Sequence, residues 1–176
     1  VQHVAPSGDD AAAGTDWTTA KQTIQAGVDA SIYGGAVLVS NGVYEAGAQT
    51  CGPFATLNRV VLKNAVTVSG VNGSEHTVIR GSPATNGQAA VRCAMMEPAT
   101  RLEGFTLTNG YTSSSQYSEG GGGVYAPDQS AVISACVLSG NRAAALGGGA
   151  QGGMLLDCRL ENNAANEGGG AYRSVL

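Results

Sequence analysis

The feature that most constrains this chain is a sequence repeat near its C-terminal end. The tetrapeptide Gly-Gly-Gly-Ala at 147–150 recurs at 168–171. The pattern of residues 133–141, Ile-Ser-Ala-Cys-Val-Leu-Ser-Gly-Asn, recurs with nearly the same offset at 155–163. Self-similarity with a period of about 20–50 residues is typical of solenoids, in which each repeat forms one coil and stacks on the next. We therefore expect a stack of coils.

The apolar runs upstream of the repeat indicate which kind of coil to expect. They are short, rich in Val, Ile, Leu and Thr, and most end in Gly or Asn-Gly, as short strands do. No helical pattern separates them, so an α/β sheet with crossover helices is not expected. The sequence predicts an all-β, right-handed parallel β-helix, a solenoid of about six coils with about 22 residues in each.

Residues at equivalent places in successive coils should stack, because neighbouring strands lie only about 4.8 Å apart. Aligning the repeat assigns two inward-facing ladders and one aligned turn position. Gly and Asn tolerate left-handed backbone, so we expect the coil to bend at the turn position, where Asn side chains can also bond from coil to coil. The ladders are Phe105, Cys136 and Cys158, and Leu107, Leu138 and Leu160, and the turn position holds Gly110, Asn141 and Asn163.

One segment, residues 16–32, has a helical pattern and lies ahead of the first coil. Its apolar stripe predicts an amphipathic helix that covers the N-terminal end of the stack and keeps the first coil dry. Trp17 could instead be a platform for stacking on a carbohydrate, but its place in the stripe favours a buried anchor. The stripe consists of Trp17, Ala20, Ile24 and Val28.

The chain reads as one domain, residues 1–176. Residues 1–34 supply an N-terminal strand and the capping helix, and residues 35–176 supply the coils. The chain stops shortly after the Gly-Gly-Gly-Ala block at 168–171, so we expect the solenoid to be open at its C-terminal end. The sequence then represents an N-terminal fragment, or a protein whose last coil is covered by something else.

Composition excludes several classes of function. Charged residues make up 12% of the chain, the formal net charge is −4, and no stretch is basic, so nucleic acid is not an expected partner. No run of about 18 apolar residues is present, so no segment is expected to span a membrane. The chain begins directly with an apparent strand, without an initiator Met. We expect a secreted or cell-surface protein whose signal peptide has been removed.

Metal and cofactor sites are not expected. The four cysteines have no C-x-x-C spacing, and the two histidines are far apart, which argues against zinc. An acidic loop holding Asp9, Asp10 and Asp16 lacks the ligand pattern of a calcium loop, so a solvated loop is favoured over a metal site. We favour a reduced ladder for Cys136 and Cys158 over a disulfide, and leave open whether Cys51 and Cys93 are paired.

The motifs resemble the bacterial right-handed parallel β-helix repeat proteins of the pectate-lyase-like superfamily, and within it the branch of the polymorphic outer-membrane proteins. The resemblance implies this fold for essentially the whole chain. It implies no single function, because members include polysaccharide lyases, hydrolases, adhesins and surface proteins without known activity. The motifs that carry it are the opening Val-Ala-Pro-Ser-Gly at 4–8, the segments 36–44, 66–73, 77–81 and 102–110, and the Gly-Gly-Gly-Ala and Cys-x-Leu-x-x-Asn repeats.

Three functions follow from this resemblance and the composition. We favour a non-catalytic extracellular or cell-surface module, adhesin-like, glycan-binding or structural, with Tyr111 and Tyr117 of the loop at 111–119 as binding residues for a polysaccharide or cell-surface glycan. The second is a self-assembling solenoid that forms end-to-end oligomers or filaments through its open C-terminal coil.

The third function is a polysaccharide lyase or hydrolase. A lyase of this fold would use an Arg or Lys base with calcium, and a hydrolase would use close carboxylates. The acidic residues are dispersed along this chain, so we name no catalytic residue. We expect the basic candidates of the upper coils to be solvated outer-face residues, and these are Lys63, Arg80, Arg92 and Arg101.

Overall fold

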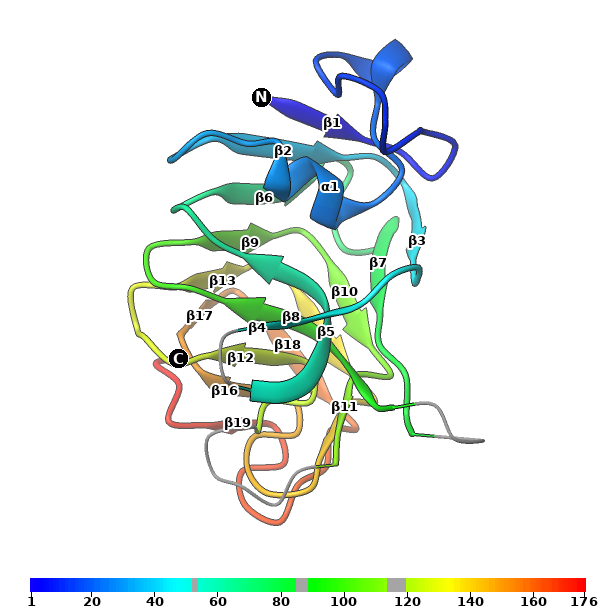
Figure 1. Cartoon of the computed structure of the whole chain (residues 1–176). Helices are drawn as coiled ribbons and strands as arrows, with labels where there is room; N and C mark the ends of the chain where they lie inside the picture. The colour runs from blue at the N-terminus through cyan, green and yellow to red at the C-terminus, as the bar shows by residue number, and fades with distance from the viewer. Residues whose placement is uncertain (52–53, 85–88, 114–119) are drawn as a thin grey trace.

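The computed structural model describes residues 1–51, 54–84, 89–113 and 120–176. Figure 1 shows short strands stacked above one another, with the N-terminus at the top of the stack. The strands of successive coils pair in parallel and form a β-solenoid of about four turns with very little helix. The predicted all-β solenoid is thus confirmed, while the predicted number of coils is wrong.

Three stacked sheets form the walls of the solenoid. The first sheet has the order β1-β2-β6-β9-β13-β17, the second β18-β14-β10-β7-β3, and the third β19-β16-β12-β8-β5-β4, while β11 and β15 pair separately. The elements are β1 (Gln2–Val4), the 3-10 helix η1 (Trp17–Thr19), α1 (Ile24–Asp29), β2 (Ala36–Val39), β3 (Gly42–Tyr44), β4 (Gln49–Cys51), β5 (Phe54–Leu62), β6 (Thr67–Gly70), β7 (Thr77–Arg80), β8 (Val91–Met96), β9 (Arg101–Glu103), β10 (Thr106–Thr108), β11 (Tyr111–Thr112), β12 (Val124–Ala126), β13 (Val132–Ser134), β14 (Val137–Ser139), β15 (Arg142–Ala143), β16 (Ala150–Gly152), β17 (Met154–Leu156), β18 (Arg159–Glu161) and β19 (Ala171–Tyr172).

The coils are longer toward the N-terminus, which is why about four turns form instead of six. In the first sheet Ala36 aligns with Thr67, and Thr67 aligns with Arg101. Arg101 then aligns with Val132, and Val132 with Met154. Only the last of these steps has the length of the repeat found in the sequence, and the three earlier steps are clearly longer. The first coil uses part of its extra length for β4, which pairs antiparallel with β5.

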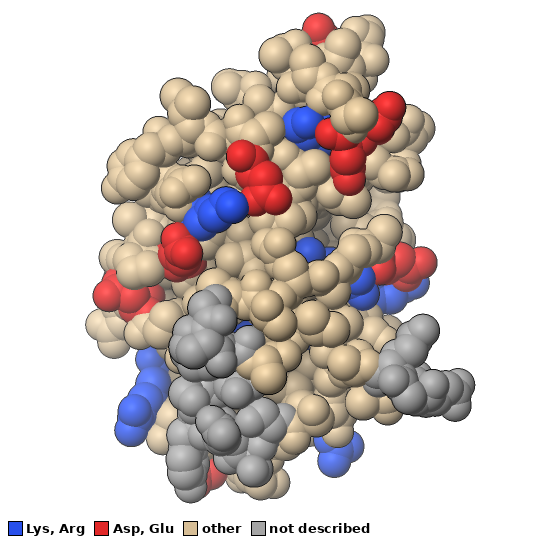
Figure 2. Space-filling model, in the orientation of Figure 1, with Lys and Arg blue, Asp and Glu red and all other residues tan. Residues whose placement is uncertain are grey.

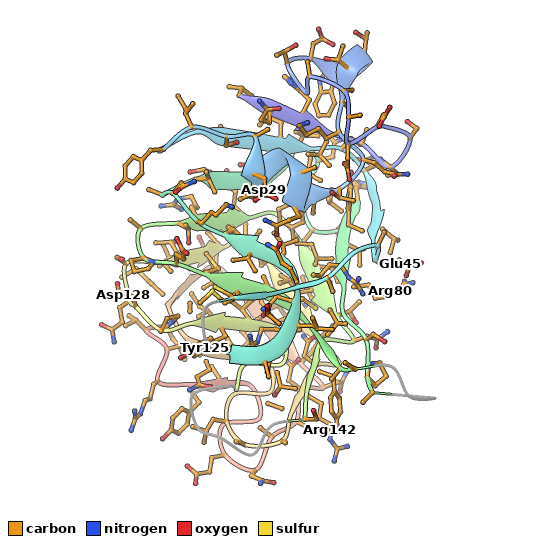
Figure 3. The ribbon with its side chains drawn as sticks, viewed as in Figure 1. Asp29, Glu45, Arg80, Tyr125, Asp128 and Arg142 are labelled. Atoms are coloured by element: carbon orange, nitrogen blue, oxygen red, sulfur yellow. The ribbon has the colours of Figure 1, made fainter. Side chains whose placement is uncertain are left out.

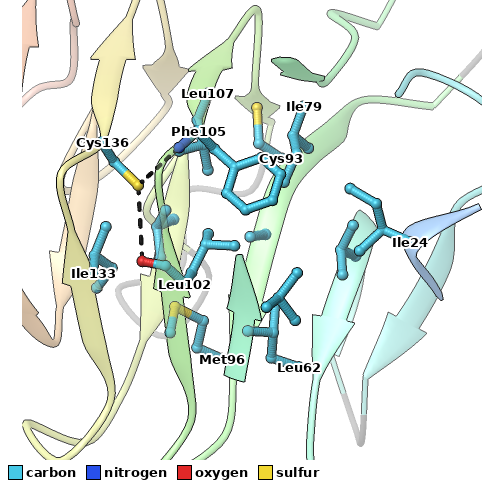
Figure 4. Close-up of a cluster of buried hydrophobic side chains, with 14 of the residues drawn as sticks. Ile24, Leu62, Ile79, Cys93, Met96, Leu102, Phe105, Leu107, Ile133 and Cys136 are labelled. Atoms are coloured by element: carbon cyan, nitrogen blue, oxygen red, sulfur yellow. Dashed lines mark hydrogen bonds between the residues drawn. The ribbon is translucent and has the colours of Figure 1, made fainter. Parts of the chain in front are cut away.

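The inward ladders lie in the second sheet and in the turn that precedes it. Leu107 pairs with Leu138, and Leu138 with Leu160, in the parallel register. Phe105 and Cys136 are buried in the same core, and Cys158 and Leu160 pack against it from the last coil, where both are partly exposed. Figure 4 shows Phe105, Leu107 and Cys136 directed into this shared interior.

The expected bend at Gly110, Asn141 and Asn163 is wrong by one residue. In each coil the preceding residue adopts the left-handed backbone, which frees the Asn side chain to bond between coils. Asn141 donates from Nδ2 to the Leu107 carbonyl (2.9 Å) and to Asn163 Oδ1 (3.1 Å), and its Oδ1 accepts from the Gly110 N–H (2.8 Å). The positive φ angles are 55° at Asn109, 64° at Gly140 and 55° at Asn162.

The N-terminal cap is shorter than the helix predicted over 16–32, because two separate N-caps divide the segment. Asp16 caps η1 and Thr23 caps α1, with extended backbone at Ala20 between them. Trp17 is 46% exposed and meets His3 edge to face at 4.6 Å. The prediction that Trp17 is a buried anchor is therefore wrong, although Ala20, Ile24 and Val28 are buried.

Helix α1 covers the N-terminal edge of β5 through one side chain. Gln25 Oε1 accepts from the Val61 N–H (2.7 Å), and Gln25 Nε2 donates to the Val61 carbonyl (3.3 Å). The side-chain amide thus makes the two bonds that a neighbouring strand would make. No helix in the described residues is long and apolar enough to cross a membrane.

All four cysteines lie in the described residues and are free thiols. Cys136 and Cys158 therefore form the reduced ladder that we favoured. Cys51 ends β4 and packs on an outer cluster of the third sheet, whereas Cys93 is fully buried in the core. The question left open for Cys51 and Cys93 is thus answered by two unpaired thiols.

Candidate functional site

A groove lies between helix α1 and strands β3 and β5, below the cap. Two neighbouring pockets of about 130 and 140 Å³ share the wall residues Thr23, Gln25, Ala46 and Arg59. We name this groove the cap groove. Its walls come from segments that are distant in the sequence and meet only because the first coil closes beneath the cap.

Arg59 of β5 forms one wall of the cap groove and is held in place by backbone carbonyl groups. Its Nε donates to the Arg80 carbonyl at 2.9 Å, and its Nη1 donates to the Gly47 carbonyl. Burial lowers the pKa of the Arg59 guanidinium, an effect opposed by Cys93 and Glu45. Because a guanidinium stays protonated in proteins, the groove carries a fixed positive charge.

Glu45 and Arg80 stand at the outer end of the cap groove. Arg80 Nη1 donates to Glu45 Oε2 at 2.9 Å, and the side chains of Arg80 and Glu45 are 42% and 57% exposed, respectively. Figure 3 labels both residues on the same side of the molecule, next to β3 and β7. Together with Arg59, they place two positive charges and one negative charge around the groove.

The inner part of the groove is less polar and tightly held. Tyr44, at the end of β3, is 6% exposed and donates from its hydroxyl to the Ser40 carbonyl at 3.0 Å. Burial raises the pKa of the Tyr44 hydroxyl, opposed by the Ser40 side chain. Its neighbour Val43 also lines the groove and is 43% exposed. The floor is therefore apolar, and polar donors stand at its rim.

The structure buries Arg92, so our expectation that this residue is solvated is wrong. Arg92 is 1% exposed. Its guanidinium donates to Asn58 Oδ1 (2.6 Å) and to the carbonyls of Gly120 and Gly121 (both 2.8 Å), and it lies 5.1 Å from the centre of the Tyr125 ring. Every group named here is a structural partner, so Arg92 is part of the scaffold beneath the third sheet.

The other basic candidates lie on the outer surface and have partners of their own. Lys63 Nζ lies 2.7 Å from Asp29 Oδ1, and Arg101 Nη1 donates to Ser134 Oγ at 3.3 Å. Figure 2 shows acidic and basic side chains scattered over a mostly uncharged face. The structure does not gather these residues with a group of carboxylates.

The acidic N-terminal loop uses its carboxylates as caps and turn acceptors. Asp10 Oδ1 accepts from the backbone N–H groups of Gln22 (2.8 Å) and Thr23 (2.7 Å), and Asp9 Oδ1 accepts from the Ala11 N–H (2.9 Å). Hydrogen bonds from Thr18 and Thr19 lower the pKa of the Asp16 carboxyl. In the described part of the chain, no three His, Cys, Asp or Glu residues are grouped so as to hold a metal ion.

Tyr111, one of the two tyrosines predicted as binding residues, lies away from the cap groove. Tyr111 is half-buried in β11, where it pairs with Arg142 of β15. In Figure 1 β11 lies several coils below β3. Tyr117 lies outside the described residues, so a binding surface made by both tyrosines stays a prediction.

Sequence reasoning missed Arg59 and Gln25 as residues that shape a site. Arg59 follows a buried Asn58 in a strand that ends in Val-Val-Leu, and this polar pair inside an apolar strand was a usable signal. Gln25 lies on an amphipathic helix, where a polar residue is ordinary. Its partner on β5 is distant in the sequence, so no local pattern identifies it.

The cap groove has the chemistry of a binding site. It presents a fixed guanidinium, a paired carboxylate and a partly apolar floor, which suits a ligand carrying hydroxyl groups or a negative charge. Glu45 is the carboxylate that lines the groove. It forms a salt bridge with Arg80. Comparison of the chain with protein-family models, with curated proteins and with solved structures finds no match.

Proposed function

We propose that this protein is a non-catalytic extracellular or cell-surface binding module, a right-handed β-helix of the pectate-lyase-like kind, that takes a glycan chain in the cap groove. The observation that carries the proposal is the set of fixed hydrogen-bonding side chains around one hollow. Arg59 is anchored by two carbonyls, and Arg80 and Glu45 hold each other. Donors that are already ordered lose little entropy when a ligand binds.

The charges of the groove further support binding. Glu45 is paired with Arg80, and burial raises the pKa of its neighbour Tyr44, so the Tyr44 hydroxyl keeps its proton at neutral pH. A sugar offers hydroxyl groups and an apolar ring face, which match the donors and the apolar floor described above. The sparse surface charge seen in Figure 2 suits contact with uncharged polymers.

A glycan array probed with the purified chain, followed by titration calorimetry on the best ligand, tests this function. We expect Glu45→Ala and Arg80→Ala each to weaken binding about tenfold, as the loss of one well-ordered hydrogen-bonding group does. Tyr111→Ala serves as the control, since β11 lies outside the groove. Unchanged affinity in both groove variants, or a loss confined to Tyr111→Ala, would contradict the cap groove as the site.

A second candidate, end-to-end assembly, is favoured by the last coil. Cys158, Leu160 and Ala171 are partly exposed there, whereas their counterparts one coil earlier, Cys136, Leu138 and Ala150, are buried. A second copy of the chain stacked on this coil would bury them. Light scattering over a hundredfold range of concentration distinguishes the two candidates, because a constant monomer mass would rule out assembly of this chain.

A further inference from the structure

Cys136 and Cys158 occupy equivalent positions in the last two coils. Val137 of β14 pairs with Arg159 of β18 in parallel register, so the cysteines that precede them stack side by side. Each cysteine follows a residue with left-handed backbone, Ala135 (φ 50°) and Asp157 (φ 51°). The two side chains therefore leave the backbone in the same direction and meet on the inner side of the turn.

The two sulfurs differ in exposure and in the hydrogen bonds that they make. Cys136 is 1% exposed, and its Sγ accepts from the Phe105 N–H at 3.5 Å, as Figure 4 shows. Cys158 is half-buried, and its Sγ donates to the carbonyls of Ile133 (3.5 Å) and Leu156 (3.4 Å), while the Cys136 thiol donates to the Leu102 carbonyl (3.7 Å). The outer sulfur is thus the more accessible of the two.

The thiols of Cys136 and Cys158 have different pKa values. The hydrogen bond from the Cys136 thiol lowers the pKa of Cys158 to about 7, against the opposing effects of burial and of the neighbouring charge of Asp157. The same contact, together with burial, raises the pKa of Cys136 well above its ordinary value. At neutral pH the outer sulfur is therefore substantially thiolate, while the inner one keeps its proton.

We propose that Cys136 and Cys158 form an oxidation site at which a hydroperoxide converts the pair into a disulfide between adjacent coils. The Cys158 thiolate attacks the peroxide, takes one oxygen and becomes a sulfenic acid, and the O–O bond breaks with release of water or an alcohol. The Cys136 sulfur then displaces the sulfenic hydroxyl, the S–S bond forms and a second water leaves. One peroxide is reduced as two thiols are oxidised, and two external thiols reverse the change by exchange.

The coil spacing is compatible with the bridge. Adjacent coils are separated by about 4.8 Å, and disulfides join cysteines whose Cα atoms lie roughly 4.4–6.8 Å apart. The coils therefore already lie at a spacing that suits the bridge, which requires turning of the two side chains. Its product would be a covalent staple between the last two coils.

The chain contains its own controls. Cys51 is half-buried like Cys158, but burial and the charge of Glu97 raise its pKa. Cys93 is fully buried, and its pKa is raised to about 12 by burial. A reagent selective for accessible thiolates should therefore distinguish Cys158 from both.

Limiting iodoacetamide at pH 7 with peptide mapping measures the first step on the native chain. At pH 7 the lower pKa gives Cys158 about 50 times more thiolate than an ordinary thiol has. The lower basicity makes this thiolate about tenfold less nucleophilic. We therefore expect Cys158 to be alkylated about fivefold faster than Cys51. Equal rates at Cys158 and Cys51 would overturn the proposed thiolate.

Stoichiometric hydrogen peroxide with mass spectrometry tests the second step. We expect the mass to fall by the two hydrogens of an intramolecular Cys136–Cys158 bridge, and Cys136→Ala to accumulate a sulfenic acid at Cys158 that dimedone traps. Cys51→Ala should behave as the parent chain, and circular dichroism checks that each variant folds. A sulfenic acid that persists in the parent chain, a bridge between two molecules, or no oxidation would each overturn the proposed pair.

Discussion

The two ends of the solenoid are stabilised in different ways. The N-terminal coils are long, carry a helix and a hairpin, and depend on individual side chains such as Gln25, Arg59 and Arg92. The C-terminal coils are short and nearly identical, and they stack glycine on glycine and Asn141 on Asn163. The comparison indicates that identical short coils can rely on backbone stacking, whereas coils of unequal length need specific side chains to close each one.

The glycine stacking should give the largest effect. In Gly149→Ala the new Cβ would lie 2.5 Å from the Gly170 carbonyl oxygen, a backbone contact that only a shift of the coil can relieve. We expect the free energy of unfolding, measured by urea titration, to fall by about 4 kcal/mol.

The equivalent glycine of the next coil provides the matched control. A Cβ at Gly170 would meet nothing closer than Leu160 Cδ2, at 3.7 Å, so Gly170→Ala should leave stability unchanged or raise it by up to about 1 kcal/mol. Similar losses in Gly149→Ala and Gly170→Ala would contradict the view that stacking on the following coil is what requires glycine.

The asparagine ladder should give the next largest effect. Asn141→Ala leaves the Gly110 N–H and the Leu107 carbonyl without their buried partner, and we expect a loss of about 3 kcal/mol in the free energy of unfolding. Asn163→Ala should cost about 1 kcal/mol, because Asn163 is partly exposed and water can replace its bonds. A larger loss at Asn163 than at Asn141 would show that burial does not set the strength of the ladder.

The cap should respond most weakly. Gln25→Ala removes both bonds to Val61 at an edge that water reaches in part, so we expect a loss of about 1 kcal/mol. Gln22→Ala removes a single exposed bond of 3.5 Å to the Pro6 carbonyl and should change stability by less than about 0.3 kcal/mol. Hydrogen exchange at the Val61 amide should rise in Gln25→Ala alone; no change there would contradict the edge-covering role of Gln25.

The sequence-based predictions succeeded where two coils share one length. Aligning residues 133–141 with 155–163 pairs Leu138 with Leu160, and the structure has the same pair in register. The coil count failed because the coils upstream of Val132 are longer than the repeat. A period read from the last coils could not be extended to the first ones.

Predictions about single side chains failed where contacts with distant segments determine whether the side chain is buried. Strand alternation correctly indicates that Arg92 points away from the core cluster that holds Cys93, but it cannot show that Asn58 and Tyr125 enclose the outer side. Helical spacing put Trp17 in a buried stripe, yet two separate N-caps divide the segment. The cap groove was not predicted because its walls converge only when the first coil closes.

The side-chain amide of Gln25 has a consequence for growth of the sheet. An exposed β-edge is a template on which further strands can add, and many proteins aggregate through such edges. At Val61 both backbone groups of the N-terminal edge are already bonded to Gln25, so an incoming strand would have to displace the helix. The free edge of β5 is therefore covered at Val61 by the helix, and nearer the start of the strand it is covered by β4.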